Sequence, residues 1–142
     1  MVYLEKPDTF SPAFEVASCF FEHDGEILLL HRNDGLGEKD TWGVPAGKIE
    51  IGEEAAEAII REAREEAGII IDSPDLTFFK KVYVKYPDKD FVFHMFHFPL
   101  KEKPVITIND ESKAFTWMKP AEALNLNLIQ DEDACINLFY FQ

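Results

Sequence analysis

Cysteine, positive charge and long hydrophobic runs are all scarce in this chain of 142 residues. Its two cysteines, Cys19 and Cys135, lie far apart and form no CxxC pair, which excludes a cysteine-rich framework. We therefore expect a reduced chain, with a single disulfide as the alternative. Because the longest apolar stretches have only the length of a strand and no signal peptide precedes them, we predict a cytoplasmic protein that does not bind a membrane.

Lysine and arginine together number 14, against 27 aspartates and glutamates, so the formal net charge is −13. Sequence-independent binding to DNA or RNA needs clustered positive charge, and we therefore expect no nucleic-acid partner. The same excess of negative charge would repel a phosphorylated small molecule. An enzyme of this composition that acts on phosphates would need divalent cations to reverse the sign of the charge locally.

The chain length is that of one domain, and an apolar fraction of 46% is ordinary for a globular protein with a hydrophobic core. The sequence contains no low-complexity tract, internal repeat or linker. We therefore predict a single domain over residues 1–142, present as a monomer or a homodimer.

The apolar runs predict strands, beginning with a hairpin. Residues 13–22 and 26–32 are apolar and β-prone, and His23-Asp24-Gly25 between them contains the Asp-Gly pair that is typical of a hairpin turn. The polar, glycine-containing residues 33–41 predict a loop. Further extended segments are expected over residues 42–45, 48–51, 76–86, 91–100 and 114–118.

The main helix is predicted over residues 53–67, which lack Gly and Pro and are rich in Ala, Glu, Arg and Ile. Gly68 follows where a C-terminal helix cap belongs. Two shorter helices are expected, one beginning at Pro120 and one over residues 131–141. This order of strands and helices predicts an α/β chain with a mixed sheet that packs against helices.

The main helix carries an apolar stripe and an acidic face. The stripe expected to pack on the sheet comprises Ala56, Ile59, Ile60, Ala63 and Ala67. Glu62, Glu65 and Glu66 have the spacing i, i+3, i+4 and cluster beside it, where like charges destabilise a helix by a few tenths of a kcal/mol. A hard cation would offset that repulsion, since Mg²⁺ favours carboxylate oxygens. The alternative is an ordinary solvated face.

The residues around this helix follow a spaced pattern. Gly47 is followed after five residues by Glu53, and after seven more by the run Arg61-Glu62-Ala63-Arg64-Glu65-Glu66-Ala67-Gly68-Ile69. The pattern resembles the Nudix box, G-x5-E-x7-R-E-U-x-E-E-x-G-U with U aliphatic, and meets every fixed position. The segment from Trp42 to Gly47 is similar to the family's lead-in, although many members have Gly where this chain has Ala46.

Resemblance to the Nudix hydrolases, and to their MutT-like branch, implies an α/β/α sandwich with a mixed β-sheet between helices. It also implies hydrolysis of a diphosphate linkage by water that a divalent metal activates. The implied ligands of Mg²⁺, or of Mn²⁺, are the carboxylates of Glu62, Glu65 and Glu66 and a backbone carbonyl oxygen of Ala46 or Gly47. Arg61 would orient Glu62 and the neighbouring carboxylates through bidentate hydrogen bonds.

Two candidate residues lie outside the box. Glu111, six residues before Trp117, is similar to the acidic loop residue that precedes a late Trp strand in the family. It is a candidate general base or extra metal ligand, and an ordinary loop acid is the alternative. Arg32 would contact a phosphate or the base of the substrate, with an exposed arginine at a strand end as the alternative.

The strand over residues 91–100 is rich in phenylalanine. Its four phenylalanines are Phe91, Phe93, Phe96 and Phe98. We expect them to fill the core and not to form a platform for base stacking.

The resemblance leaves the substrate open. A small nucleoside triphosphate, cut to the monophosphate and pyrophosphate, is the first choice. The alternatives are a nucleotide sugar of the ADP-ribose type or a dinucleoside polyphosphate. A different class of function would be a nucleotide-sensing module without catalysis, but a module that only binds has no need for all three glutamates.

Overall fold

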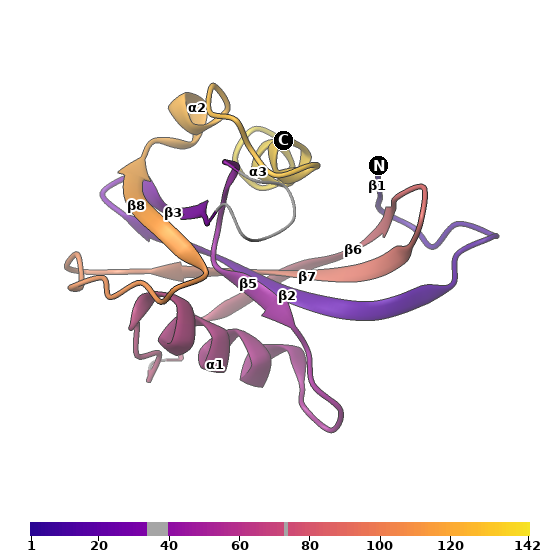
Figure 1. Ribbon diagram of the computed structural model, residues 1–142, viewed down its shortest axis with the longest axis horizontal. Coiled ribbons are helices and arrows are strands. Elements are labelled where there is room, and N and C mark those ends of the chain that lie inside the picture. The colour runs from indigo at the N-terminus through magenta and orange to yellow at the C-terminus, as the bar shows by residue number, and fades with distance from the viewer. Residues whose placement is uncertain (34–39, 73) are drawn as a thin grey trace.

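The computed structural model describes residues 1–33, 40–72 and 74–142. Within these residues an eight-stranded mixed sheet lies between helices, with α1 on one face and α2 and α3 on the other (Figure 1). The strands are β1 (Val2–Tyr3), β2 (Pro12–His23), β3 (Glu26–Arg32), β4 (Trp42–Gly43), β5 (Ala46–Lys48), β6 (Thr77–Lys85), β7 (Asp90–Pro99) and β8 (Ser112–Met118). The helices are α1 (Ala55–Ala67), α2 (Pro120–Ala123) and α3 (Glu132–Tyr140).

The long strand β2 organises the sheet. It runs parallel to β7, which is antiparallel to β6, and β1 forms the edge beyond β6. On its other side β2 changes partner along its length. It pairs with β3 at the hairpin and with β5 at Val16–Ser18. Because β3 pairs in turn with β8 and β4, the sheet on this side of β2 divides into two branches, one formed by β5 and the other by β3 with its partners.

Helix α1 begins at Ala55, two residues later than predicted. Glu53 precedes the helix and Glu54 is its N-cap. Glu54 forms a capping box, in which its backbone N–H donates to Glu57 Oε1 at 2.8 Å. At the other end Gly68 has φ 71° and donates its N–H to the carbonyl of Arg64, as the predicted C-terminal cap. The helix is therefore closed at both ends by local interactions.

Hydrophobic cores lie on both faces of the sheet. The core on the α1 face includes Ala17, Leu28, Ile59, Ala63 and Phe96, and the core on the α3 face includes Phe20, Ile27, Leu29, Met95 and Ile136. The stripe predicted for α1 was wrong at Ile60, which is 39% exposed, while Ala58 is fully buried in its place. A helix on each face therefore completes the sandwich that the sequence predicted.

The short strands do not lie where the sequence analysis predicted them. Ala46 and Gly47, expected between two extended pieces, lie within β5 and pair with Ser18 and Ala17 of β2. The two-residue strand β1 was not expected. Of the loop predicted over residues 33–41, residues 34–39 lie outside the described part. In the part that is described, no helix is both long and apolar enough to cross a membrane.

Candidate active site

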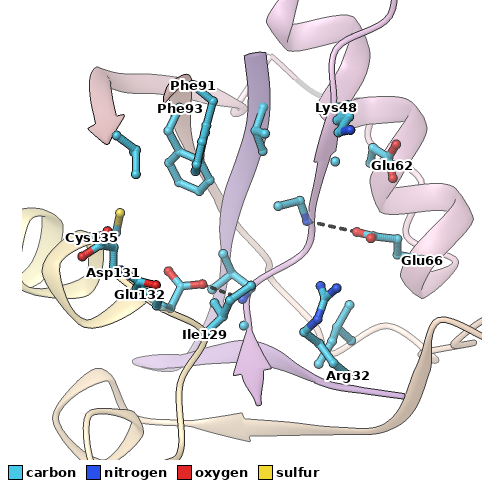
Figure 2. A pocket seen from close by; sticks show the side chains of 18 of the residues that line it. Arg32, Lys48, Glu62, Glu66, Phe91, Phe93, Ile129, Asp131, Glu132 and Cys135 are labelled. Atoms are coloured by element: carbon cyan, nitrogen blue, oxygen red, sulfur yellow. Dashed lines mark hydrogen bonds between the residues drawn. The ribbon is translucent and has the colours of Figure 1, made fainter. Parts of the chain in front are cut away.

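A cavity of about 500 Å³ lies between α1, the sheet and the start of α3. Charged side chains line one end of it, namely Arg32, Lys48, Glu62, Glu66 and Glu111. The rest of the cavity is lined by apolar and aromatic side chains, including Phe91, Phe93, Ile129 and Cys135, together with Glu132 and the charged residues Asp131 and Lys89. Figure 2 shows Glu62, Glu66 and Arg32 on one side of the strand segment that crosses the cavity, and Glu132, Asp131 and Cys135 on the other.

Arg61 ties the start of the box to its acidic end. Its Nε and Nη2 donate to the two carboxylate oxygens of Glu53, each at 2.9 Å, and Nη2 also donates to the carbonyl of Lys48 at 3.1 Å. Its Nη1 donates to Glu62 Oε1 at 2.7 Å. The guanidinium lowers the pKa of Glu53 to about 2, chiefly through this bidentate hydrogen bond. Arg61 therefore fixes the carboxylate of Glu62 against β5.

Glu62 lies against the backbone of Gly47. A Cβ atom at Gly47 would come within 2.1 Å of Glu62 Cδ, so any side chain there would displace the carboxylate. Burial raises the pKa of Glu62, although the hydrogen bond from Arg61 opposes the shift. The glycine of the box thus leaves room for a carboxylate beside the backbone.

Glu66 is the most strongly perturbed of the predicted ligands. Its Oε1 accepts the backbone N–H of Ala46 at 3.0 Å. Burial raises its pKa well above the ordinary value, the negative charges of Glu62 and Glu111 raise it further, and the positive charge of Arg32 opposes them. The structure therefore brings Glu66, Glu62, Glu111 and Arg32, all predicted site residues, together at one end of the cavity.

Glu111 and Glu65 differ in placement. Glu111 lines the cavity and is held by Asn109, whose Nδ2 donates to Glu111 Oε2 at 3.2 Å and whose Oδ1 accepts the Glu111 N–H at 3.1 Å. Glu65 is 53% exposed and does not line the cavity, and its carboxylate lies 3.4 Å from Arg61 Nη1. Of the three predicted carboxylate ligands, two thus line the cavity, and the third lies outside it beside Arg61, a position that we call the rim.

The charged end of the cavity fits a divalent cation by its chemistry. Glu62 and Glu66 supply hard oxygen donors, and burial raises the pKa of both, with a further contribution from neighbouring negative charges. A bound cation would offset that crowding. Among the described residues no three Asp, Glu, His or Cys side chains already lie close enough together to hold an ion by themselves. Substrate phosphates and water would therefore have to complete the coordination, as is usual for Mg²⁺.

Two features of the cavity were missed by sequence analysis. Glu132 is buried, with 5% exposure, and its Oε1 accepts the backbone N–H of Val44 at 2.9 Å. Burial raises its pKa to about 7. The only sequence signal was an acidic residue in the first turn of a helix, where acids are common.

Phe91 and Phe93, expected purely as core, also line the cavity, whereas Phe96 and Phe98 do belong to the core on the α1 face.

Comparison with known proteins agrees with this geometry. Residues 12–139 match the family model of the NUDIX domain. The nucleoside triphosphatase NudI of Salmonella agona is 33% identical over 110 residues, which are 71% of this chain and 78% of that protein. The CTP pyrophosphohydrolase of Escherichia coli is 30% identical over 117 residues, 80% of this chain and 82% of that protein. The crystal structure of a MutT NUDIX hydrolase from Burkholderia pseudomallei has a TM-score of 0.76 at 22% identity and covers 89% of this chain and 97% of that one.

The chain therefore belongs to the Nudix hydrolase family, and the predictions of the family and of its fold are confirmed. The match spans β2 through α3, so it includes both ends of the cavity.

Proposed function

We propose that this protein is a Mg²⁺-dependent pyrophosphohydrolase that converts a small nucleoside triphosphate to the monophosphate and pyrophosphate. The observation that carries the proposal is the division of one cavity into an acidic end and an aromatic end. A nucleoside triphosphate has the matching division into phosphates and a flat base. The names of two relatives, a nucleoside triphosphatase and a CTP pyrophosphohydrolase, support the same substrate class.

In the proposed site, Glu62 and Glu66 hold the metal together with a backbone carbonyl oxygen of Ala46 or Gly47. Mg²⁺ or Mn²⁺ would neutralise phosphate charge there and lower the pKa of water. Glu65 lies at the rim, so its role is to steady Arg61 or to meet a second ion brought by the substrate. The contact of Glu62 with Gly47 keeps the carboxylate beside the carbonyl groups of β5.

The other charged residues bind and orient. Arg32 and Lys48 line the same end of the cavity and provide positive charge for phosphate oxygens. Arg61 keeps Glu62 in place through its hydrogen bonds to Glu53 and Glu62. Glu111, oriented by Asn109, accepts the proton of the attacking water as general base.

We also propose that the chain acts as a single domain over residues 1–142 in the cytoplasm, where nucleoside triphosphates are available. Both cysteines are free and buried, in keeping with a reduced protein. The predictions of a monomer or homodimer, and of no nucleic-acid partner, remain predictions.

A substrate screen with identification of products tests the function. Ribo- and deoxyribonucleoside triphosphates, ADP-ribose and diadenosine tetraphosphate would each be incubated with Mg²⁺, and the products separated by ion exchange. We expect monophosphate and pyrophosphate from a triphosphate. Cleavage of ADP-ribose or the dinucleotide alone would move the enzyme to one of the alternative classes, and binding without turnover of any compound would support a sensing module.

A further inference from the structure

One oxygen of the Glu132 carboxyl is buried in the cavity wall without a partner. Oε1 accepts the Val44 N–H, but Oε2 is inaccessible to solvent and has no hydrogen-bond partner within residues 1–33, 40–72 and 74–142. A buried carboxyl oxygen that makes no hydrogen bond costs free energy, so such groups in native proteins usually meet a ligand or an ordered water. Since Glu132 lines the cavity, the missing partner can come from a bound molecule.

The distance between Glu132 and the charged end of the cavity, where the phosphates are proposed to bind, suits a nucleotide. Val44 donates to Glu132 and Ala46 donates to Glu66, and these backbone nitrogens are at most about 7 Å apart because an extended chain rises by about 3.3–3.6 Å per residue. With hydrogen bonds of 2.9 and 3.0 Å at either end, the two bound oxygens are separated by no more than about 13 Å. A nucleotide bound with its base at Glu132 and its phosphates at Glu66 is compatible with this upper limit.

The surroundings of Glu132 suit a flat ring. Phe91 and Phe93 line the same end of the cavity, and Figure 2 shows them on the same side as Glu132, with Cys135 beside them. Ile129 borders Glu132, since both side chains lie within 3.4 Å of the position that a Cβ at Gly43 would take. A largely aromatic slot with one buried carboxyl oxygen that has no partner would therefore hold a base and contact one atom of its edge.

We propose that Glu132 selects the nucleobase of the substrate by accepting a hydrogen bond from an exocyclic amino group at Oε2. The proposal rests on the proposed function and adds a substrate class, namely nucleotides of cytosine, adenine or guanine. An amino group projects from its ring and offers an N–H to a single recessed oxygen. In uracil and thymine the corresponding group is a carbonyl oxygen, which repels a carboxylate, and the ring N–H is flanked by carbonyl oxygens on both sides.

Matched pairs of nucleotides test this selection. CMP differs from UMP, and AMP from IMP, on the base edge where an amino group is replaced by a carbonyl. Binding of each product by titration calorimetry at pH 8, above the pKa of Glu132 near 7, does not depend on turnover. We expect the amino-bearing member of at least one pair to bind about tenfold or more tightly, the discrimination expected of one hydrogen bond to a charged group.

The variant Glu132→Gln exchanges the acceptor for a donor. Its remaining oxygen can still accept the Val44 N–H, while the amide nitrogen takes the place of Oε2 and suits a carbonyl. We expect the preference for the amino base to fall about tenfold, both in binding and in the kcat/KM ratios for CTP over UTP or ATP over ITP. Asp133→Asn is the matched control, since Asp133 is an exposed acid of the same helix turn and does not line the cavity.

The two proposals fail in different ways. If neither pair shows a preference in the wild type, or if Glu132→Gln keeps the preference of the wild type, the inference about Glu132 is overturned whatever the enzyme hydrolyses. If the binding preference is present and depends on Glu132 but no triphosphate is cleaved, the inference stands and the proposed reaction fails. A loss of preference in Asp133→Asn as large as in Glu132→Gln would also overturn the inference about Glu132. The loss would then follow from removing a negative charge from this helix turn and not from a hydrogen bond at Glu132.

Discussion

The two ends of the cavity hold buried carboxyl groups in opposite settings. Glu66 accepts an N–H from Ala46 and Glu132 accepts one from Val44, so the same backbone segment anchors both. Glu62 and Glu111 add negative charge around Glu66, which also lies near Arg32, whereas Glu132 lies beside Asp131 and the apolar side chains of Ile129 and Cys135. Clustered carboxylates around Glu66 call for a cation, while the buried Glu132 oxygen that has no partner calls for one hydrogen-bond donor.

The largest expected effect is on Glu66. We expect Glu66→Gln to lower kcat about 10³-fold, because a metal ion contributes several kcal/mol to the transition state and about 1.4 kcal/mol corresponds to a factor of ten. Steady-state release of pyrophosphate measures the change. Glu65→Gln is the matched comparison at the rim of the cavity and should cost at least tenfold less. Equal losses in the two variants would show that the rim position is as much a metal ligand as the buried one.

The next effect concerns the stability of the fold and involves Glu132. Burial raises its pKa from 4.5 to about 7, so the folded state holds this proton more tightly than the unfolded state does. The stabilisation is complete below about pH 4.5 and is lost as pH rises through about 7, with a total of about 3 kcal/mol. Glu132→Gln removes the ionisation, so its unfolding free energy relative to the wild type should increase by that amount between pH 4.5 and 8.

Urea denaturation of both proteins at a series of pH values, without nucleotide, measures this difference. Glu62 and Glu66 also have raised pKa values, but they are present in both proteins and their effects cancel. A difference that does not vary with pH would mean that Glu132 is ionised as easily in the folded chain as in the unfolded one, and the contrast between the two ends would lose its electrostatic basis.

A smaller effect is expected at Arg61. Lysine keeps the charge but cannot donate through a planar fork to Glu53 and Glu62 at once. We expect Arg61→Lys to lower kcat/KM and the apparent Mg²⁺ affinity by about 10–100-fold, as is typical for residues that orient metal ligands. Activity measured against Mg²⁺ concentration gives both values. Unchanged Mg²⁺ affinity would indicate that Glu62 keeps its position without Arg61.

The smallest effect is stabilisation by the metal itself. At a Mg²⁺ concentration ten times its dissociation constant, linkage stabilises the folded state by about 1.4 kcal/mol, or a few degrees in Tm. Thermal melting should show this shift in the wild type and in Glu132→Gln but not in Glu66→Gln. A shift that survives in Glu66→Gln would place the cation elsewhere.

Sequence analysis grouped the residues of the charged end correctly in space because the information for that grouping is local. The residues from Gly47 to Ile69 run through one strand, one loop and one helix and end just beyond the C-terminal cap of that helix, which is closed by its own capping residues. The expected ranges of β3 and α1 were accordingly close to those observed. Glu66 and Glu62 could be placed on one face because helical spacing determines which side chains are neighbours.

The other end of the cavity, around Glu132, could not be predicted in this way because it depends on contacts between distant parts of the chain. Glu132 is buried by its packing against Val44, 88 residues earlier, and nothing near it in sequence distinguishes it from an ordinary acid at the start of a helix. Phe91 and Phe93 line the cavity because β7 runs parallel to β2, a pairing that no turn signal announces. The same holds for β1, whose two residues are extended only because β6 pairs with them.

The central claim is that Glu62 and Glu66 form a metal site for hydrolysis of a diphosphate linkage. ³¹P NMR of the protein with a nucleoside triphosphate, in Mg²⁺ and again after chelation with EDTA, tests it most directly. The account predicts monophosphate and pyrophosphate with Mg²⁺, no turnover without it, and almost none for Glu66→Gln in either condition. Turnover that continues at the same rate in EDTA, or that is unchanged in Glu66→Gln, would contradict it.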